Sequence, residues 1–442
     1  MDNQLTMFDI LYPKYKIKKP IRLIEFFAGY GSQALALKYL GVDFEHWKIC
    51  EWAIKSIQAY KDIHFENESA ILVGLDKEQE VERLYKQGIS SNYNEPMTKQ
   101  QIQRLSLEQI YRITENNLIT HNLVNIQQVK GEDLEIVDTD KYDYILTYSF
   151  PCQDLSLAGK GKGMSDTTTR SGMLWEVERI LTECYELGNL PQILLMENVP
   201  QVHGTDNVKD FNKWQLKLEE LGYKNYWQDL IATDYGIPQT RNRTFMVSIL
   251  GDYNYTFPKP IPLKLKLKDM LEDNVDEKYF ISDKLLQYYN KKIDEGWRKE
   301  LHLNKDTAST LCNPSRNQIN DTFIGVFDLK ESDTFRPTIE DRIHLDYPYS
   351  KTLCTRDDST TIMLIKNNTK QGYLEATDIA IVDKPSDLRI RKLTPKECFR
   401  LMGVKDEDFK KCAKNQSDSS LYHLAGDSIV VNVLMAIFKE LL

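Results

Sequence analysis

Residues 21 to 41 read IRLIEFFAGYGSQALALKYLG, and this stretch decides the fold. The apolar run at its start predicts a buried strand, and the apolar residues after Gly31 recur with helical spacing as far as Gly41. Between the two, Gly29, Gly31 and Ala34 fit the G-x-G-x-x-G/A pattern, in which missing side chains let the backbone approach a ligand above the helix amino end. Strand, glycine turn and helix together predict a Rossmann-like α/β domain.

An acidic residue follows at the spacing expected for a nucleoside ligand. Glu51 lies 20 residues beyond Gly31, after a second apolar stretch. A carboxylate at this place accepts hydrogen bonds from ribose hydroxyls. The residues therefore predict a nucleoside cofactor, and they leave open whether it is NAD or S-adenosylmethionine.

Length and composition indicate a large globular protein. With 442 residues and 41% hydrophobic content, the chain is long enough for two domains. We find no apolar stretch of the length needed to cross a membrane, and the first 20 residues lack the apolar core of a signal peptide. The seven cysteines are widely scattered, which favours a reducing, cytoplasmic compartment and no structural metal.

The charge balance favours a small-molecule enzyme over a nucleic-acid-binding protein. The chain has 57 basic and 66 acidic residues, a net charge of −9, and DNA is a polyanion. Phosphate binding depends on a local basic face, however, and such a face can coexist with acidic surface elsewhere. The motifs must therefore decide.

Three further motifs stand beside short apolar runs that we expect to be strands of one sheet. SFPCQ ends on residue 153 after the run 144–148, ENV begins at Glu197 after the run 193–196, and QTRNR precedes the run 245–250. In QTRNR the two arginines alternate along an extended segment and share one face. A thiol (Cys152), an acid (Glu197) and a cation (Arg243) are the elements of a covalent catalytic site.

These motifs resemble, in order and over almost the whole chain, those of the bacterial and phage cytosine-5 DNA methyltransferases. FFAGYGS resembles the cofactor loop of the family, EW its ribose-binding pair, GEDL its adenine-binding motif, SFPCQ its nucleophile motif, ENV its acid motif and QTRNR its arginine motif. RKLTPKECFRLMG and GDSIVVNV resemble its last two blocks. The resemblance implies S-adenosyl-L-methionine as cofactor and double-stranded DNA as substrate.

The resemblance also implies roles for particular residues. The Cys152 thiolate would add to carbon 6 of a flipped-out cytosine, a protonated Glu197 would hydrogen-bond nitrogen 3, and Arg243 would hold the 2-keto oxygen. The implied catalytic residues are Cys152, Glu197, Arg243, Asn198 and Arg241. The implied cofactor-binding residues are Phe27, Gly29, Gly31, Ser32, Glu51, Trp52, Asp133, Pro151 and Ser428, and no metal is implied.

The domain organisation follows the same resemblance. We expect a Rossmann-like catalytic domain and a smaller, mostly β target recognition domain. The expected boundaries are a leader at 1–20, a catalytic domain at 21–250 and 389–442 with a helical insert at 62–128, and the target recognition domain at 251–388. A loop at 157–172 with Lys160, Lys162 and Arg170 would close over the flipped base, and base edges would be read by residues such as Arg316, Asn317, Gln318 and Arg356.

Two departures and several alternatives accompany the resemblance. The long insert is one departure, and the other is Asp427, where the family has asparagine; an aspartate there can still cap a closing helix that we expect from Ile429 to Leu441.

We expect a monomer in the cytoplasm of a bacterial or phage-infected cell, and the sequence leaves a companion restriction endonuclease open. The alternatives are a transfer RNA cytosine-5 methyltransferase, a catalytically inert DNA-binding regulator of the same fold, and an NAD-linked oxidoreductase with a catalytic thiol.

Overall fold

The computed structural model describes most of the chain. The described residues are 13–72, 74–151, 172–280, 282, 302–303, 307–308, 310, 323–327, 361–367, 371–373 and 388–442. Several residues singled out in the sequence lie outside them: Cys152, Lys160, Lys162, Arg170, Arg316, Asn317, Gln318 and Arg356.

A six-stranded sheet forms the larger part of the molecule, in the order β2-β1-β3-β4-β6-β5. The first four strands in this order are parallel, and β6 runs antiparallel to both of its neighbours. The strands are β1 (Ile21–Phe26), β2 (Phe44–Cys50), β3 (Asp143–Tyr148), β4 (Ile193–Asn198), β5 (Tyr223–Ile231) and β6 (Asn242–Leu250). The Rossmann-like α/β fold expected from the sequence is confirmed.

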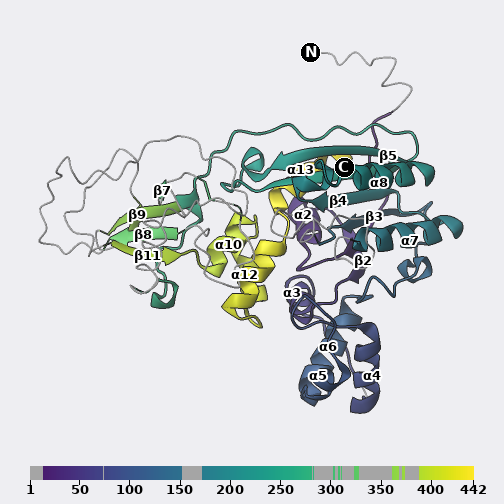
Figure 1. Cartoon of the computed structure of the whole chain (residues 1–442), viewed down its shortest axis with the longest axis horizontal. Coiled ribbons are helices and arrows are strands. Elements are labelled where there is room, and N and C mark those ends of the chain that lie inside the picture. The colour runs from purple at the N-terminus through teal and green to yellow at the C-terminus, as the bar shows by residue number, and fades with distance from the viewer. Residues whose placement is uncertain are drawn as a thin grey trace, which may run out of the picture.

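Helices cover both faces of this sheet (Figure 1). Alternate side chains of β1, β3 and β4 enter two separate apolar cores, as the period of an extended strand requires. One core contains α2 (Ser32–Leu40) and α13 (Val431–Leu441), and the other contains α7 (Met173–Glu186) and α8 (Val208–Glu220). Residues from the far end of the chain therefore complete the core that lies under the glycine turn.

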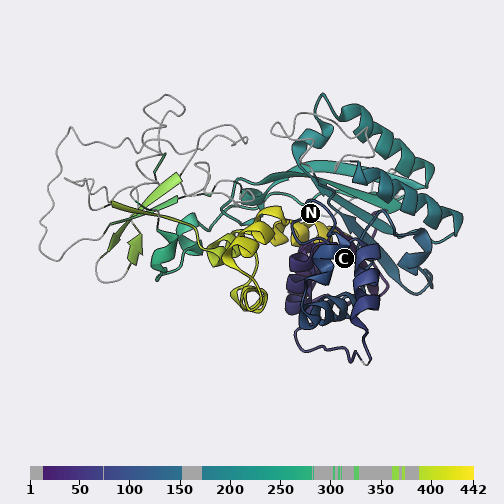
Figure 2. The ribbon, with the colours of Figure 1, turned by 60° about the horizontal axis from the view of Figure 1, so that its bottom comes forward.

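A second, smaller sheet lies at the other end of the molecule, with α10 (Pro395–Leu401) and α12 (Asp418–Asp427) between the two sheets (Figures 1 and 2). Its strand order is β10-β9-β8-β11, and β7 pairs with β9. The strands are β7 (His302–Leu303), β8 (Phe323–Phe327), β9 (Thr361–Asn367), β10 (Gln371–Tyr373) and β11 (Leu388–Lys392). Strand β11 leads directly into α10 and so returns the chain to the larger domain.

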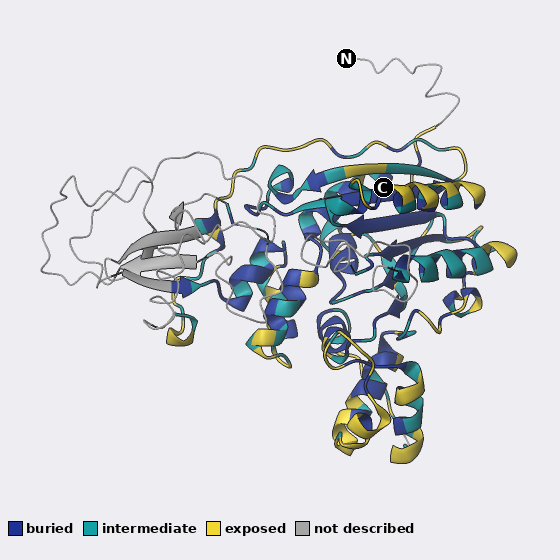
Figure 3. Cartoon of the chain, viewed as in Figure 1, coloured by how far each residue is buried: buried dark blue, intermediate teal, exposed yellow. Residues whose placement is uncertain are grey.

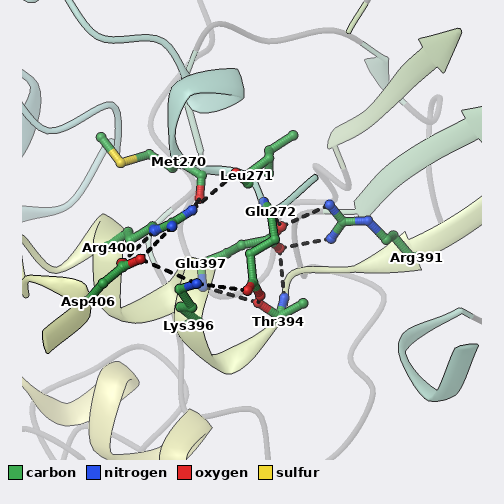
Figure 4. Close-up of polar contacts among 9 residues, drawn as sticks. All are labelled: Met270, Leu271, Glu272, Arg391, Thr394, Lys396, Glu397, Arg400 and Asp406. Carbon is green, nitrogen blue, oxygen red and sulfur yellow. Dashed lines mark hydrogen bonds and ion pairs between the residues drawn. The ribbon is translucent and has the colours of Figure 1, made fainter. Parts of the chain in front are cut away.

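A polar network stabilises the connection from β11 to α10 (Figure 4). Arg391 and Glu397, 1% and 0% exposed, form a buried ion pair with nitrogen–oxygen distances of 2.8 and 2.9 Å. Glu397 also accepts the backbone N–H groups of Thr394 and Glu272. Lys396 and Arg400 extend the network through ion pairs with Glu272 and Asp406 and hydrogen bonds to the carbonyls of Met270 and Leu271. The outgoing and returning segments of the chain are thus tied together where the domains meet.

The insert forms a helical unit of its own, as its spacing predicts. Its helices are α4 (Lys77–Gln87), α5 (Lys99–Gln103) and α6 (Leu107–Ile119), and they project below α3 (Ile54–His64) in Figure 1. Asp76, Thr98 and Ser106 cap their amino ends. Their outer faces are exposed (Figure 3), and their inner faces form a separate apolar core.

The carboxyl-terminal helices correct one expectation, the capping role of Asp427. Asp427 does not cap the closing helix: it is the last residue of α12, its carboxylate lies 3.2 Å from Nδ1 of His423, and α13 begins only after Val430. The stretch Asp418–Leu441 is also long and apolar enough to cross a membrane by length and composition, although the sequence analysis found no such stretch. It consists of two helices with a break at Ser428, and 67% of its most apolar 18-residue window is buried, so we assign it to the protein core.

Candidate active site

The glycine turn between β1 and α2 has the conformation that only glycine adopts easily. Gly29 and Gly31 have φ values of 56° and 80°. A Cβ atom on Gly31 would lie 2.5 Å from Nε2 of His64, whereas one on Gly29 would meet nothing within 4 Å. The backbone of Gly31 therefore packs tightly against the protein, whereas the space above Gly29 is open. A ligand could lie close to the backbone at Gly29.

Glu51 lies directly beside this turn. Its Oε2 accepts the N–H of Gly29 at 3.0 Å, and its Oε1 accepts the N–H of Ala53 at 2.8 Å. Burial raises the pKa of this carboxyl to about 7, against the lowering effect of the backbone N–H groups. Each oxygen keeps a further lone pair for a ligand hydroxyl, so the group fits a ribose.

Asn122, which the sequence analysis did not single out, fixes the position of Glu51. Its side-chain oxygen accepts the backbone N–H of Glu51 at 3.1 Å, and its side-chain nitrogen donates to the backbone carbonyl of Glu51 at 2.9 Å. This residue follows α6, 71 positions along the chain. Sequence offers no signal for such a contact, because an asparagine after a helix is an ordinary turn residue.

The last motif packs against the glycine turn. The Tyr30 hydroxyl and the Ser428 hydroxyl are 2.8 Å apart, and Ser428 also donates to the carbonyl of Ala425. Buried Arg241 donates to the carbonyls of Gly426 and Ser428 at 3.0 and 2.8 Å. In the described residues, therefore, Arg241 and Ser428 hold the turn between α12 and α13 beside the glycine turn, and Asp427 is exposed at that turn.

Only some of the other predicted cofactor-binding residues lie at the glycine turn. Phe27, with φ 56°, donates its N–H to the carbonyl of Cys50 and so belongs to the glycine turn, and Ser32 is the buried first residue of α2. Trp52 packs on the core of the insert. Asp133 lies in a 3-10 turn, Gly131–Leu134, and accepts the N–H of Lys130 at 2.8 Å. That hydrogen bond is local and does not connect Asp133 with the glycine turn.

Glu197 and Arg243 meet at the end of β4. Because β6 runs antiparallel to β4, with Asn198 opposite Thr244, the amino end of β6 lies beside the carboxyl end of β4. The Arg243 Nε atom is 3.1 Å from Oε1 of Glu197. Burial raises the pKa of Glu197, and the charges of Arg243 and Arg241 oppose this shift. The result is a buried acid that holds its proton more firmly than usual beside a fixed cation.

Asn198 connects this pair with the nucleophile motif. Its side-chain nitrogen donates to the carbonyl of Phe150 at 3.0 Å, and its side-chain oxygen accepts the N–H of Val199 at 2.8 Å. Phe150 and Pro151 directly precede Cys152, which lies outside the described residues. The described part of the site thus brings together Glu197, Arg243 and the segment that leads into the nucleophile motif.

Comparison with known proteins identifies the family. The family model for C-5 cytosine-specific DNA methylases matches residues 95–442. The chain belongs to this family. The enzyme class expected from the motifs, a DNA cytosine-5 methyltransferase, is confirmed.

Curated members of this family match most of the chain. The Type II methyltransferase M2.ScrFI of Lactococcus lactis subsp. cremoris is 32% identical over 427 residues, which cover 95% of this chain and 99% of the relative. The orphan methyltransferase M.SssI of Spiroplasma monobiae is 35% identical over 277 residues, covering 61% of this chain and 69% of the relative.

Solved structures of distant methyltransferases share the fold. The Entamoeba histolytica methyltransferase EhMeth aligns with a TM-score of 0.57 at 15% identity, over 96% of this chain and 98% of that one. The S. pombe Dnmt2 methyltransferase aligns with a TM-score of 0.56 at 14% identity, over 95% and 98% of the two chains. At these identities the likeness concerns the fold alone.

Proposed function

We propose that this methyltransferase modifies carbon 5 of a flipped-out cytosine in double-stranded DNA, through a covalent bond to Cys152, with S-adenosyl-L-methionine as methyl donor. The observation that carries the proposal is the pairing of Glu197 with Arg243 at the end of β4, where Asn198 holds the segment that leads to Cys152. An acid and a cation meet there, and Cys152 follows Pro151 in the sequence; acid, cation and thiol are the groups that this reaction needs.

The reaction begins by activating the base. Carbon 5 of cytosine is too weak a nucleophile to attack a methyl sulfonium directly. When the Cys152 sulfur forms a bond to carbon 6, carbon 5 becomes enamine-like, and a proton held by Glu197 at nitrogen 3 relieves the charge that builds up on the ring. S-adenosyl-L-methionine supplies the electrophilic methyl group to carbon 5. A base then removes the carbon-5 proton, and the bond between carbon 6 and sulfur breaks.

Arg243 has two roles in this proposal. A free cysteine thiol has a pKa of about 8.5, so nearby positive charge is needed to hold the thiolate at neutral pH. Arg243 supplies such a charge at the site and would also donate to the 2-keto oxygen of the base. The base must leave the DNA stack to reach these groups, at a cost of a few kcal/mol.

The cofactor would lie along the glycine turn. Gly29 offers an open backbone face, Glu51 would accept the ribose hydroxyls, and the Ser428 turn would close the far side. We keep Phe27, Trp52, Asp133 and Pro151 as proposed contacts on the strength of the motifs alone.

The first test compares methyl transfer to different substrates. Wild-type protein, Cys152→Ser and the control Cys184→Ser are incubated with labelled S-adenosyl-L-methionine and with DNA, transfer RNA or neither. Cys184 lies on the buried face of α7, and a serine there keeps the contact with the carbonyl of Gly131. We expect label in DNA only, lost in Cys152→Ser and retained in the control. Transfer to RNA but not DNA would favour the transfer RNA alternative, and no transfer at all would favour an inert regulator.

DNA with 5-fluorocytosine at the target gives a second readout. Fluorine cannot leave carbon 5 as a proton does, so the covalent complex should accumulate and survive denaturant, and it should require Cys152. Absence of this complex in an active preparation would refute the covalent mechanism.

The biological setting is a separate proposal. We propose a monomer in the cytoplasm of a bacterial or phage-infected cell, with or without a companion restriction endonuclease. Light scattering of the purified protein tests the monomer, and methylation-sensitive sequencing of DNA from expressing cells identifies the modified site.

A further inference from the structure

Ala308 pairs with the arginine motif, residues 239–243. The N–H of Ala308 donates to the carbonyl of Pro238 at 2.7 Å, and the N–H of Thr240 donates to the carbonyl of Ala308 at 2.9 Å. The two segments run parallel here, and Ala308 is fully buried. The Thr310 hydroxyl adds a hydrogen bond to the carbonyl of Thr240 at 3.3 Å. The motif thus has a strand-like partner from outside the larger sheet.

This partner follows closely on the smaller sheet. Strand β7 (His302–Leu303) pairs in parallel with β9 of that sheet, and Ala308 is five positions beyond the end of β7. Five residues span at most about 18 Å even when fully extended. The smaller sheet is therefore tied to the arginine motif by a short length of chain.

The return connection of the smaller sheet reaches the same place. Strand β11 leads into α10, and the side-chain nitrogen of Gln239 donates to the carbonyl of Leu401, the last residue of α10, at 2.7 Å. Gln239 is fully buried. The segment after β7 and the segment after β11 therefore both contact the motif at its amino-terminal end.

The two arginines of the motif contact the proposed cofactor and base sites. Arg241 donates to the carbonyl of Ser428 at 2.8 Å, beside the glycine turn, and Nε of Arg243 lies 3.1 Å from Oε1 of Glu197. The arginines follow Thr240 by one and three residues. A displacement of Thr240 would pass to both of them, because so little chain lies between.

We propose that the smaller sheet positions the arginine motif and that Ala308 is the positioning residue: its two backbone hydrogen bonds set where Arg243 stands relative to Glu197. The inference rests on the proposed function, in which Arg243 acts on the base and on Cys152. It gives residues 251–388, which we expect to read the target sequence, an effect on the rate of the reaction in addition to the choice of target.

Methylation of duplex DNA by the full chain, measured across a range of pH, tests the proposal. Ala308→Pro removes the N–H that donates to Pro238, whereas the conservative variant Ala308→Gly keeps both backbone groups. We expect Ala308→Pro to lower kcat about 10- to 10²-fold, the effect of a misplacement of about 1 Å at a catalytic group, with little change in KM for DNA. Ala308→Gly should restore most of the lost rate.

The pH profile separates positioning from a general loss of structure. The charges of Arg243 and Arg241 lower the pKa of Glu197, so this pKa rises when Arg243 moves away. The descending limb of kcat/KM against pH, where Glu197 loses its proton, should therefore move to higher pH in Ala308→Pro. A smaller fraction of folded protein would instead reduce the rate alike at every pH and leave the limb in place.

Thr310 supplies a second pair of variants, which decides the matter if Ala308→Pro does not fold. Thr310→Val keeps the shape of the side chain without the hydroxyl, and Thr310→Ser keeps the hydroxyl. We expect Thr310→Val to lower kcat about 2- to 10-fold, the effect of one hydrogen bond, and to move the same limb in the same direction. Thr310→Ser should show neither effect to the same extent.

A folded Ala308→Pro whose descending limb stays at the wild-type pH would overturn this inference alone, whatever its kcat. If that variant does not fold, identical profiles for Thr310→Val and Thr310→Ser would overturn it. A wild-type protein that transfers no methyl group to DNA would instead overturn the proposed function, and the inference with it.

Discussion

The Nε atom of Arg243 lies 3.1 Å from Oε1 of Glu197, although the two residues come from strands that run in opposite directions. Within the described residues the arginine contacts one oxygen of the carboxyl, and in our proposal the other oxygen serves the substrate. In a parallel arrangement of β4 and β6, the amino end of β6 would lie at the opposite edge of the sheet. The reversal of this one strand therefore places the cation beside the acid.

Glu197→Gln tests the acid directly. The amide keeps the shape of the side chain and can donate a hydrogen bond, but it cannot share a proton with nitrogen 3 of the base. We expect single-turnover methylation to fall about 10²- to 10⁴-fold, with cofactor affinity nearly unchanged. Glu219→Gln, on the exposed side of α8, is the control. A wild-type rate in Glu197→Gln would remove Glu197 from the chemistry.

Arg243→Ala should change the pH dependence of the reaction. The Arg243 charge lowers the pKa of Glu197 and, in our proposal, that of the Cys152 thiol. Without it both pKa values rise: the thiolate forms only at higher pH, and Glu197 keeps its proton to higher pH. Both limbs of a plot of kcat/KM against pH should therefore move to higher pH, and the maximum should fall. Limbs that stay in place would show that Arg243 does not act on either group.

Cofactor binding should depend on the ionisation of Glu51. Its pKa is raised to about 7, and the ionised form is the better acceptor for ribose hydroxyls. Below that pH a proton must be released on binding, so affinity should rise with pH up to about 7 and then level off, with a limiting slope of about tenfold per pH unit. Calorimetry across this range measures the slope.

Glu51→Ala completes that experiment. It should weaken the binding of S-adenosyl-L-methionine by about 1.5 to 3 kcal/mol at pH values where Glu51 of the wild type is ionised. It should also remove the pH dependence of this binding. Unchanged affinity would give Glu51 a structural role, as the bonds to Gly29 and Ala53 would then indicate.

Stability should depend on the buried pair at the domain crossing. Arg391→Met leaves the Glu397 carboxylate buried without its partner, and we expect a loss of about 3 to 5 kcal/mol in the free energy of unfolding, measured with urea. The double variant Arg391→Met/Glu397→Leu should recover part of this loss. Lys396→Met is the control, since this partly exposed lysine in the same network should contribute no more than about 1 kcal/mol. Equal losses in Arg391→Met and Lys396→Met would contradict the argument.

Sequence specificity should reside in residues 251–388. In the proposed function the catalytic motifs bind the cofactor and the cytosine, which are common to every target, so the flanking bases must be read elsewhere. Alanine at Arg316, Asn317, Gln318 or Arg356 should relax the preference for at least one position, by about 1 to 3 kcal/mol per good base contact. Methylation of a randomised-site DNA library, read by sequencing, measures this. If these variants keep the parental preference and deletions in the insert change it, the reading surface lies in the insert.

The positions of Glu51 and Glu197 could be predicted because each follows a recognisable apolar strand at a fixed offset. Asp427 was expected to cap a helix from Ile429, but α12 continues through Asp427 and α13 begins at Val431, so three residues separate Asp427 from the helix that it was expected to cap. The contacts of Asn122 and Ser90 with the Glu51 segment could not be predicted, since they join residues far apart in the chain and use backbone groups that every residue carries. For the same reason, the insert was expected only as a helical addition.

Helix α13 packs against α2, and the Tyr30–Ser428 hydrogen bond joins residues 398 positions apart. During synthesis on the ribosome, the apolar face of α2 emerges early and lacks its contact with α13 until the long segment between the two helices has followed. The glycine turn cannot take its final surroundings before then. A nascent chain therefore carries an exposed apolar surface that chaperones can bind. The surroundings of the glycine turn are complete only after α13 has been synthesised, so chains that stop before α13 should be inactive as well as prone to aggregate.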